Sequence, residues 1–159
     1  MKMPISGRKT VLGLGNILQR DEGLGVHALR TMENELGETV DVDWIDGGTL
    51  GLDLLPVVER SGGLLILDAV DRGEKGGSLI DMPGEEIPLF SRIRLSPHQI
   101  SFQEVLGLAR IRDNFPERIH LLGIQPVDLS SGLELSPEVN ASLPALVRRA
   151  KEIIVAWGC

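Results

Sequence analysis

The chain has 159 residues and a formal net charge of −7, and 42% of its residues are hydrophobic. This length fits one domain whose core needs no disulfide or metal staple, and the acidic charge argues against a nucleic-acid surface. Aromatic residues make up only 3%, which leaves little for stacking single-stranded bases. The single cysteine, Cys159, excludes a disulfide framework within the chain and is typical of a reducing cytoplasm.

The N-terminal residues contain no apolar region of the kind found in signal peptides. The longest apolar runs along the chain are too short to cross a bilayer. We therefore expect a cytoplasmic protein that is not inserted in a membrane, and we take it to be a monomer. Residues 1–8 are expected to form a flexible N-terminal segment, and residues 9–159 are expected to form a single α/β domain.

Strand-like and helix-like segments alternate along the chain. In chain order, the sequence predicts a strand (10–14), a helix (21–36), a strand (40–46), a helix (50–60), a buried strand (64–70), an edge strand (78–82), a helix (96–112), a strand (119–124) and a helix (136–157). Asp21 and Ser96 are predicted to cap the helices that they open, and Ser136-Pro137-Glu138 is predicted to open the last helix. This order predicts a three-layer α/β/α fold around a twisted, mostly parallel mixed sheet of about five strands, with residues 78–82 antiparallel at an edge.

Four polar side chains stand where such a sheet binds its ligands, outside the carboxyl ends of the strands. Asp46 follows the second predicted strand, and Asp68 lies near the end of the third. Glu22 opens the helix after the first strand, and His98 opens a helix after a long loop. Glu22, Asp68 and His98 together offer two carboxylates and one imidazole, which can bind a divalent ion and leave positions for a substrate group.

Each of these residues also has a purely structural interpretation. Glu22 could complement the positive end of its helix dipole, Asp46 could stabilise its turn through backbone hydrogen bonds, and His98 could face solvent. Asp68 is harder to explain in this way, because a carboxylate inside an apolar strand is costly to bury without a partner. His27 and His120 have no carboxylate at a ligand spacing, and we interpret them as structural or surface residues.

The glycine loop that follows the first strand leaves other function classes open. Gly13-Leu14-Gly15 is similar to the start of a dinucleotide fingerprint, but Leu18 replaces the third glycine and two acids occupy the place of the pyrophosphate. A nucleotide-binding, Rossmann-like module is nevertheless one alternative, and a stand-alone metallohydrolase that holds its own zinc is another. The chain has no Gly-x-Ser-x-Gly elbow, which argues against a serine hydrolase.

Ordered sequence blocks run from about Val11 to the last helix, and together they resemble the nickel–iron hydrogenase maturation endopeptidases. The blocks are Gly13–Leu18, Asp21–Val26, Asp46–Thr49, Asp68-Ala69, Ser96–Gln99, Gly123–Pro126 and Gly132–Pro137. The resemblance implies a cytoplasmic endopeptidase with a mixed sheet between helices. It also implies a reaction, removal of the C-terminal extension of a hydrogenase large-subunit precursor after nickel insertion.

The resemblance also implies roles for the candidate residues. Glu22, Asp68 and His98 match the metal-contacting positions of the family, and Asp46 matches a further acid of the site. The nickel is carried by the substrate precursor, and another divalent ion such as zinc or cadmium can replace it in vitro. Glu22 or Asp68 can act as the general base if metal does not fully engage its carboxylate. If the metal only positions the substrate, Asp46 can be the base, so these three acids are the catalytic candidates.

Overall fold

The fold is taken from a computed structural model that describes residues 7–89 and 97–158, with the side chains of residues 97–101 outside that description. The strands are β1 (Arg8–Leu14), β2 (Asp43–Gly48), β3 (Ser61–Ala69), β4 (Leu79–Pro83) and β5 (Arg118–Ile124). The α-helices are α1 (Leu24–Leu36), α2 (Leu55–Arg60), α3 (Pro97–Ile111) and α4 (Pro137–Ala156). Short 3-10 turns are η1 (Arg20–Gly23), η2 (Gly37–Thr39), η3 (Leu52–Leu54) and η4 (Gly84–Glu86).

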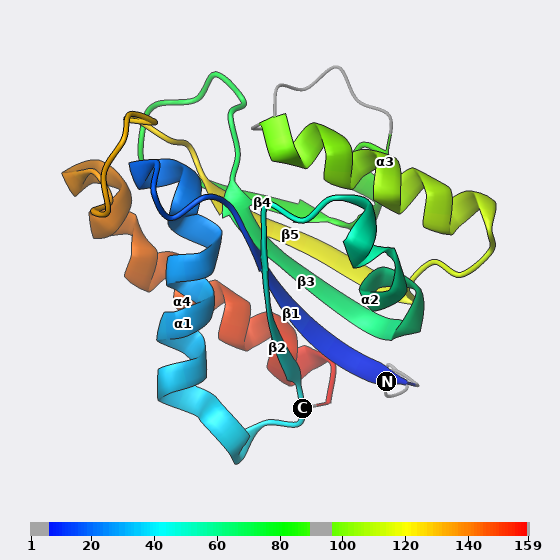
Figure 1. Cartoon of the computed structure of the whole chain (residues 1–159). Coiled ribbons are helices and arrows are strands. Elements are labelled where there is room, and N and C mark those ends of the chain that lie inside the picture. The colour runs from blue at the N-terminus through cyan, green and yellow to red at the C-terminus, as the bar shows by residue number, and fades with distance from the viewer. Residues whose placement is uncertain (1–6, 90–96, 159) are drawn as a thin grey trace.

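The strands form one five-stranded sheet in the order β2-β1-β3-β5-β4. All neighbouring pairs are parallel except β4 and β5, which run antiparallel at the edge. Helices α1 and α4 cover one face of the sheet, and α2 and α3 cover the other (Figure 1). The predicted three-layer fold with a mostly parallel sheet and an antiparallel edge strand is therefore confirmed.

The central strand β3 is buried on both faces, as its continuous apolar run predicts. Leu65 and Leu67 pack into the core beneath α1 and α4, whereas Leu64 and Ile66 pack into the core beneath α2 and α3. Each of these side chains is at most 2% exposed, and full burial of one such side chain contributes about 2 kcal/mol. The sheet is thus anchored at its centre, and the loops at the ends of its strands are built on a rigid base.

Several element boundaries differ from the sequence-based expectation. β3 begins at Ser61 rather than at Leu64, because Ser61 and Gly63 already pair with the start of β1. The hydroxyl groups of Ser61 and Thr10 also bond each other at 2.7 Å inside the sheet. β1 begins at Arg8, whose guanidinium bonds Asp43 of β2. The predicted start of the last helix is confirmed: α4 begins at Pro137, and the Ser136 hydroxyl caps it by accepting the N–H of residue 139. The predicted cap at residue 96 lies outside the described residues.

Candidate active site

The carboxyl ends of β1, β3 and β5 meet at one edge of the sheet because these strands run parallel. The segments that follow them, residues 15–23, 70–78 and 125–136, gather at this edge together with the first turn of α3 (Figure 1). Open α/β sheets bind their ligands at such an edge. We refer to it below as the carboxyl edge.

Asp68 is the penultimate residue of β3, and its side chain is completely buried. The flanking residues Ile66 and Val70 pack beneath α2 and α3, so alternation along the strand places Asp68 on that face of the sheet. Its Oδ1 accepts the backbone N–H of Ala69 at 2.7 Å. The backbone of Asp68 also packs tightly against Gly123 of β5, where an added Cβ would lie only 2.4 Å from the Asp68 carbonyl oxygen. The carboxylate is thus rigidly placed and shielded from water.

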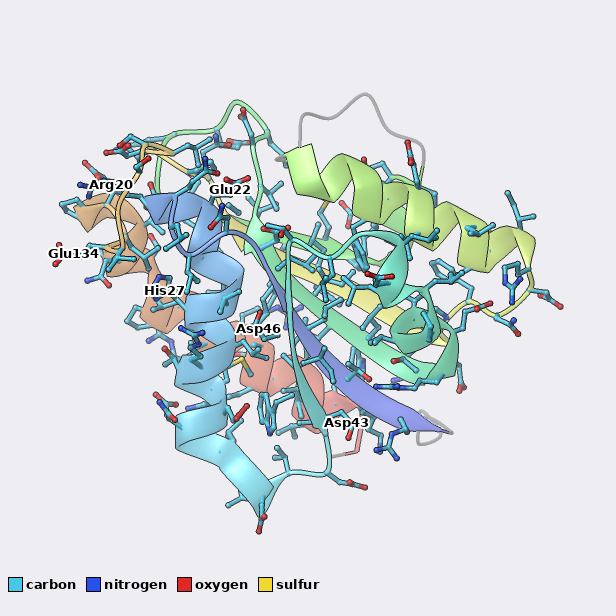
Figure 2. The ribbon with its side chains drawn as sticks, in the orientation of Figure 1. Arg20, Glu22, His27, Asp43, Asp46 and Glu134 are labelled. Atoms are coloured by element: carbon cyan, nitrogen blue, oxygen red, sulfur yellow. The ribbon has the colours of Figure 1, made fainter. Side chains whose placement is uncertain are left out.

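Glu22 lies in η1, between the end of β1 and the start of α1, and it is 6% exposed. The η1 backbone lies directly against the end of β1, and only glycine fits at position 15 there. Gly15 has a φ of +127°, and a Cβ on it would lie 1.9 Å from the Glu22 carbonyl oxygen. The η1 turn also contacts β3, the strand that carries Asp68. Figure 2 shows Glu22 at the carboxyl edge. The fold therefore brings two buried acids, both expected from the sequence, to the same edge of the sheet.

His98 lies in the first turn of α3, and its side chain is outside the described residues. The helix covers the face on which Asp68 lies, and its first turn stands at the carboxyl edge (Figure 1). Among the described residues, no three His, Cys, Asp or Glu side chains are grouped so as to hold a metal ion. The metal-ligand assignment of His98 stays a prediction.

Asp46 is not brought together with the two buried acids. Its side chain is 49% exposed, and its Oδ2 lies 3.6 Å from the guanidinium of Arg30 on α1. Its Oδ1 accepts the N–H of Gly48 at 3.0 Å, which is the turn-stabilising bond that the structural interpretation expected. Figure 2 shows Asp46 alongside α1. Its contact with the site is indirect, because the Gly48 carbonyl in turn accepts the N–H of Gly15 at 2.9 Å.

Asp21 has a different role from the predicted one. The prediction that it caps the following helix is wrong, because neither η1 nor α1 has a side-chain cap. Asp21 is instead completely buried, and its carboxylate accepts hydrogen bonds from residues more than 100 positions later in the chain. A local sequence signal could not have identified these partners.

Gln125 is a second buried polar residue that sequence reasoning missed. Its Oε1 accepts the N–H groups of Arg72 and Glu74 at 2.8 and 3.1 Å, and its Nε2 donates to Asp71 at 3.0 Å. One amide side chain after β5 thus fixes the loop that follows β3. The signals in the sequence are its place at the end of a predicted strand and within the Gly123–Pro126 block.

Comparison with known proteins shows which family the whole chain is similar to. The hydrogenase maturation protease (HycI) family model matches residues 26–153. The hydrogenase expression/formation protein HupD of Rhizobium leguminosarum bv. viciae is 38% identical over 98% of this chain and 78% of its own length. The hydrogenase 2 maturation protease of Escherichia coli (strain K12) is 36% identical over 87% of this chain and 86% of its own. The chain belongs to the hydrogenase maturation protease family.

Solved structures agree with this hydrogenase maturation protease assignment. The hydrogenase maturating endopeptidase HybD from Escherichia coli superposes with a TM-score of 0.85 and 31% identity, covering 95% of this chain and 94% of that one. The NiFe hydrogenase maturation protease HybD from Thermococcus kodakarensis has a TM-score of 0.75 and 27% identity, covering 92% and 99%. As a maturation protease the chain is an endopeptidase. The family assignment therefore argues against the alternative of a nucleotide-binding module.

The opposite edge of the sheet of this maturation protease carries a separate polar cluster. There His120 bonds Asp81, and the Arg149 Nε donates to the other oxygen of Asp81 at 2.7 Å. A surface hollow of about 780 Å³ lies beside this cluster and is lined by His120 and Arg149 but by neither Glu22 nor Asp68. The structural interpretation of His120 agrees with this pairing.

Burial, together with the charge of a nearby arginine, lowers the pKa of the half-buried His27 on α1.

In the described part of this maturation protease, we find no helix with the length and apolar character needed to cross a membrane.

Proposed function

We propose that this endopeptidase removes the C-terminal extension of a nickel–iron hydrogenase large-subunit precursor after nickel insertion, and that it recognises the nickel carried by that substrate. Glu22, Asp68 and His98 are the proposed contacts to the ion. One observation carries the proposal: two nearly fully buried acids reach the same sheet edge from η1 and from β3. Membership in the maturation protease family supports a hydrogenase protein as the substrate.

The chemistry of the donors supports a divalent ion at this edge. Glu22 and Asp68 are 6% and 0% exposed, and two acidic side chains at one edge create a negative potential that favours a divalent cation. Carboxylate oxygens and an imidazole nitrogen suit nickel, zinc and cadmium, and three protein ligands leave positions for ligands from the substrate. An ion held in this way would polarise the scissile carbonyl.

The residues of the chain supply binding and proton transfer. Asp68, fixed by the β3 backbone, orients the substrate-borne ion, and Glu22 is held at the same edge by η1, which contacts β3. The carboxylate oxygen that is not engaged by the ion accepts the proton of the attacking water, a role that contributes about 100-fold to 10,000-fold in rate. Rigid placement of Asp68 suits the ligand role, which favours Glu22 as the base.

The surroundings of the site support a protein as the substrate. Leu18, Leu129 and Leu133 lie in the loops at the carboxyl edge and are 60%, 46% and 65% exposed. Two of these loops are joined directly, because the N–H of Gly132 donates to the Leu18 carbonyl at 2.9 Å. Exposed apolar side chains beside a polar centre are typical of a surface that meets another protein.

The test is cleavage of a large-subunit precursor with and without nickel, followed by intact mass spectrometry. We expect the wild-type protein to release a C-terminal peptide only from the nickel-loaded precursor. Glu22→Gln and Asp68→Asn should each slow release at least about 100-fold. Glu134→Gln makes the same chemical change on an exposed residue of the neighbouring loop and should cleave normally. Normal cleavage by Glu22→Gln, or equal cleavage of both precursors, would refute the proposal.

A further inference from the structure

Asp21 makes an unusually complete set of hydrogen bonds for a side chain outside the proposed ion contacts. Its Oδ2 accepts the N–H groups of Val127 and Asp128 at 2.9 and 2.8 Å and the hydroxyl of Ser136 at 2.8 Å. Its Oδ1 accepts the N–H of Ser136 at 2.7 Å. The carboxylate is 0% exposed, so these four donors are its compensation for lost hydration. Asp21 thus ties η1 to the segment between β5 and α4.

The shape of the η1 turn depends on contacts with another segment of the chain as well as on its own backbone bonds. It has four residues and no side-chain cap. Arg20 at its start has a φ of +46°, a left-handed conformation that costs a non-glycine residue energy and persists only when the surroundings enforce it. The enforcing bonds come from the same segment, since Arg20 N–H donates to Gly132 at 3.0 Å and Asp21 N–H donates to Asp128 at 3.1 Å.

Glu22 occupies the same single turn, directly after Asp21. We propose that Asp21 is a positioning residue for Glu22: its buried carboxylate fixes η1 against residues 127–136 and thereby places the Glu22 carboxylate for cleavage. This inference rests on the proposed function of Glu22. It assigns to Asp21 a role in the reaction without contact to substrate or ion, and it makes the segment between β5 and α4 part of the active-site support.

The bond pattern explains why this position requires a carboxylate. Four donors point at its two oxygens, so the site needs an acceptor on both sides. An asparagine in the same orientation keeps the oxygen that accepts three bonds but turns its NH₂ group toward the N–H of Ser136. Two donors then face each other, and either the side chain or the η1 backbone must move. Although Asp21→Asn hardly changes the size of the side chain, it should therefore displace Glu22.

The test measures cleavage of the nickel-loaded precursor by Asp21→Asn. We expect kcat to fall about 100-fold, the loss associated with a displacement of about 1 Å at a catalytic group, and KM to change less than about threefold. Ser61→Ala is the matched control, because Ser61 is also a buried hydrogen-bonding residue but lies at the opposite end of β3. At equal urea midpoints of unfolding, Ser61→Ala should cleave at the wild-type rate. Equal rates for the two variants would overturn the proposal.

A double-mutant cycle separates positioning from general damage to the fold. In a Glu22→Asp background, where the carboxylate is already displaced, Asp21→Asn should slow cleavage less than about threefold. The same 100-fold loss in both backgrounds would overturn the proposal. If Asp21→Asn does not fold, Ser136→Ala removes only one of the four donors and should show the same non-additivity with Glu22→Asp. Normal cleavage by Glu22→Gln refutes the proposed function itself, whereas an inactive Glu22→Gln beside a fully active Asp21→Asn refutes only the positioning role.

Discussion

Gly25 lies in the first turn of α1, where the helix packs on the ends of β1 and β3. A Cβ at this position would lie 2.0 Å from the carbonyl oxygen of Leu67 and 2.4 Å from that of Leu14. Both neighbours are backbone atoms of the central sheet, which cannot rotate away as a side chain can. Non-bonded heavy atoms settle near about 3.5 Å, so Gly25→Ala requires the start of α1 to move outward by at least about 1 Å.

The cost of this movement can be worked out from opposing terms. Overpacking of a tight interface costs about 1–3 kcal/mol, and two backbone contacts favour the upper end of that range. Alanine is better than glycine inside a helix by about 1 kcal/mol. The expected net destabilisation by Gly25→Ala is therefore about 2 kcal/mol. Because η1, the turn that carries Glu22, leads directly into the displaced start of α1, we also expect cleavage of the precursor to slow by about 100-fold.

Urea unfolding gives the stability, and intact mass spectrometry of the precursor gives the cleavage rate. Gly37→Ala is the control at the other end of α1, since its φ is +46° and nothing lies within 4 Å of the added Cβ. Because its ψ is −121°, it should cost the backbone strain of an alanine in a conformation that favours glycine, about 1–3 kcal/mol, and leave cleavage unchanged. The reasoning is refuted if Gly25→Ala unfolds at the wild-type urea concentration and cleaves at the wild-type rate.

Three further predictions follow from the polar groups. Asp46→Asn keeps the oxygen that accepts the Gly48 N–H, so we expect cleavage within about tenfold of wild type, and a loss beyond about 100-fold would instead make Asp46 the base. Burial alone would raise the pKa of Asp81, but bonds from His120 and Arg149 outweigh it and lower that pKa. The stability from this cluster is therefore present above the unfolded pKa and lost as pH falls through the folded pKa, so urea midpoints from pH 6 to pH 3 should fall more for wild type than for Asp81→Asn. Metal analysis of the purified protein without precursor should find nickel and zinc well below one equivalent, whereas near-stoichiometric zinc would indicate a resident ion.

The parts of the site that could be predicted from the sequence are those fixed by strand periodicity. A continuous apolar run identified β3 as a central strand, and the position of Asp68 at its end then placed that residue at the carboxyl edge. The same periodicity places Asp46. Val42 and Trp44 are four and two positions before it, so they share its face of the strand, and both pack beneath α1 and α4. Asp46 therefore belongs to the opposite face from Asp68. Relating the faces of two strands requires the strand order, which the sequence pattern alone does not provide.

The parts that could not be predicted depend on contacts between distant segments. Asp21 followed by an apolar periodic run indicates a helix cap, since capping is the local use of an aspartate at such a position. Its actual partners are residues 127, 128 and 136. Gln125 likewise bonds residues 71, 72 and 74. Both side chains became identifiable only when the fold brought the loops after β1, β3 and β5 together.

The two buried acids are therefore held by elements of different rigidity. Asp68 belongs to the centre of a sheet whose core residues surround it, so a change that displaces it must also disturb the sheet and lower the free energy of unfolding. Glu22 belongs to a single turn held mainly by bonds to residues 127–136. Such loop contacts open at a smaller free-energy cost than core strands. Substitutions in residues 127–136 should consequently reduce cleavage before they reduce stability, whereas substitutions around Asp68 should reduce both together.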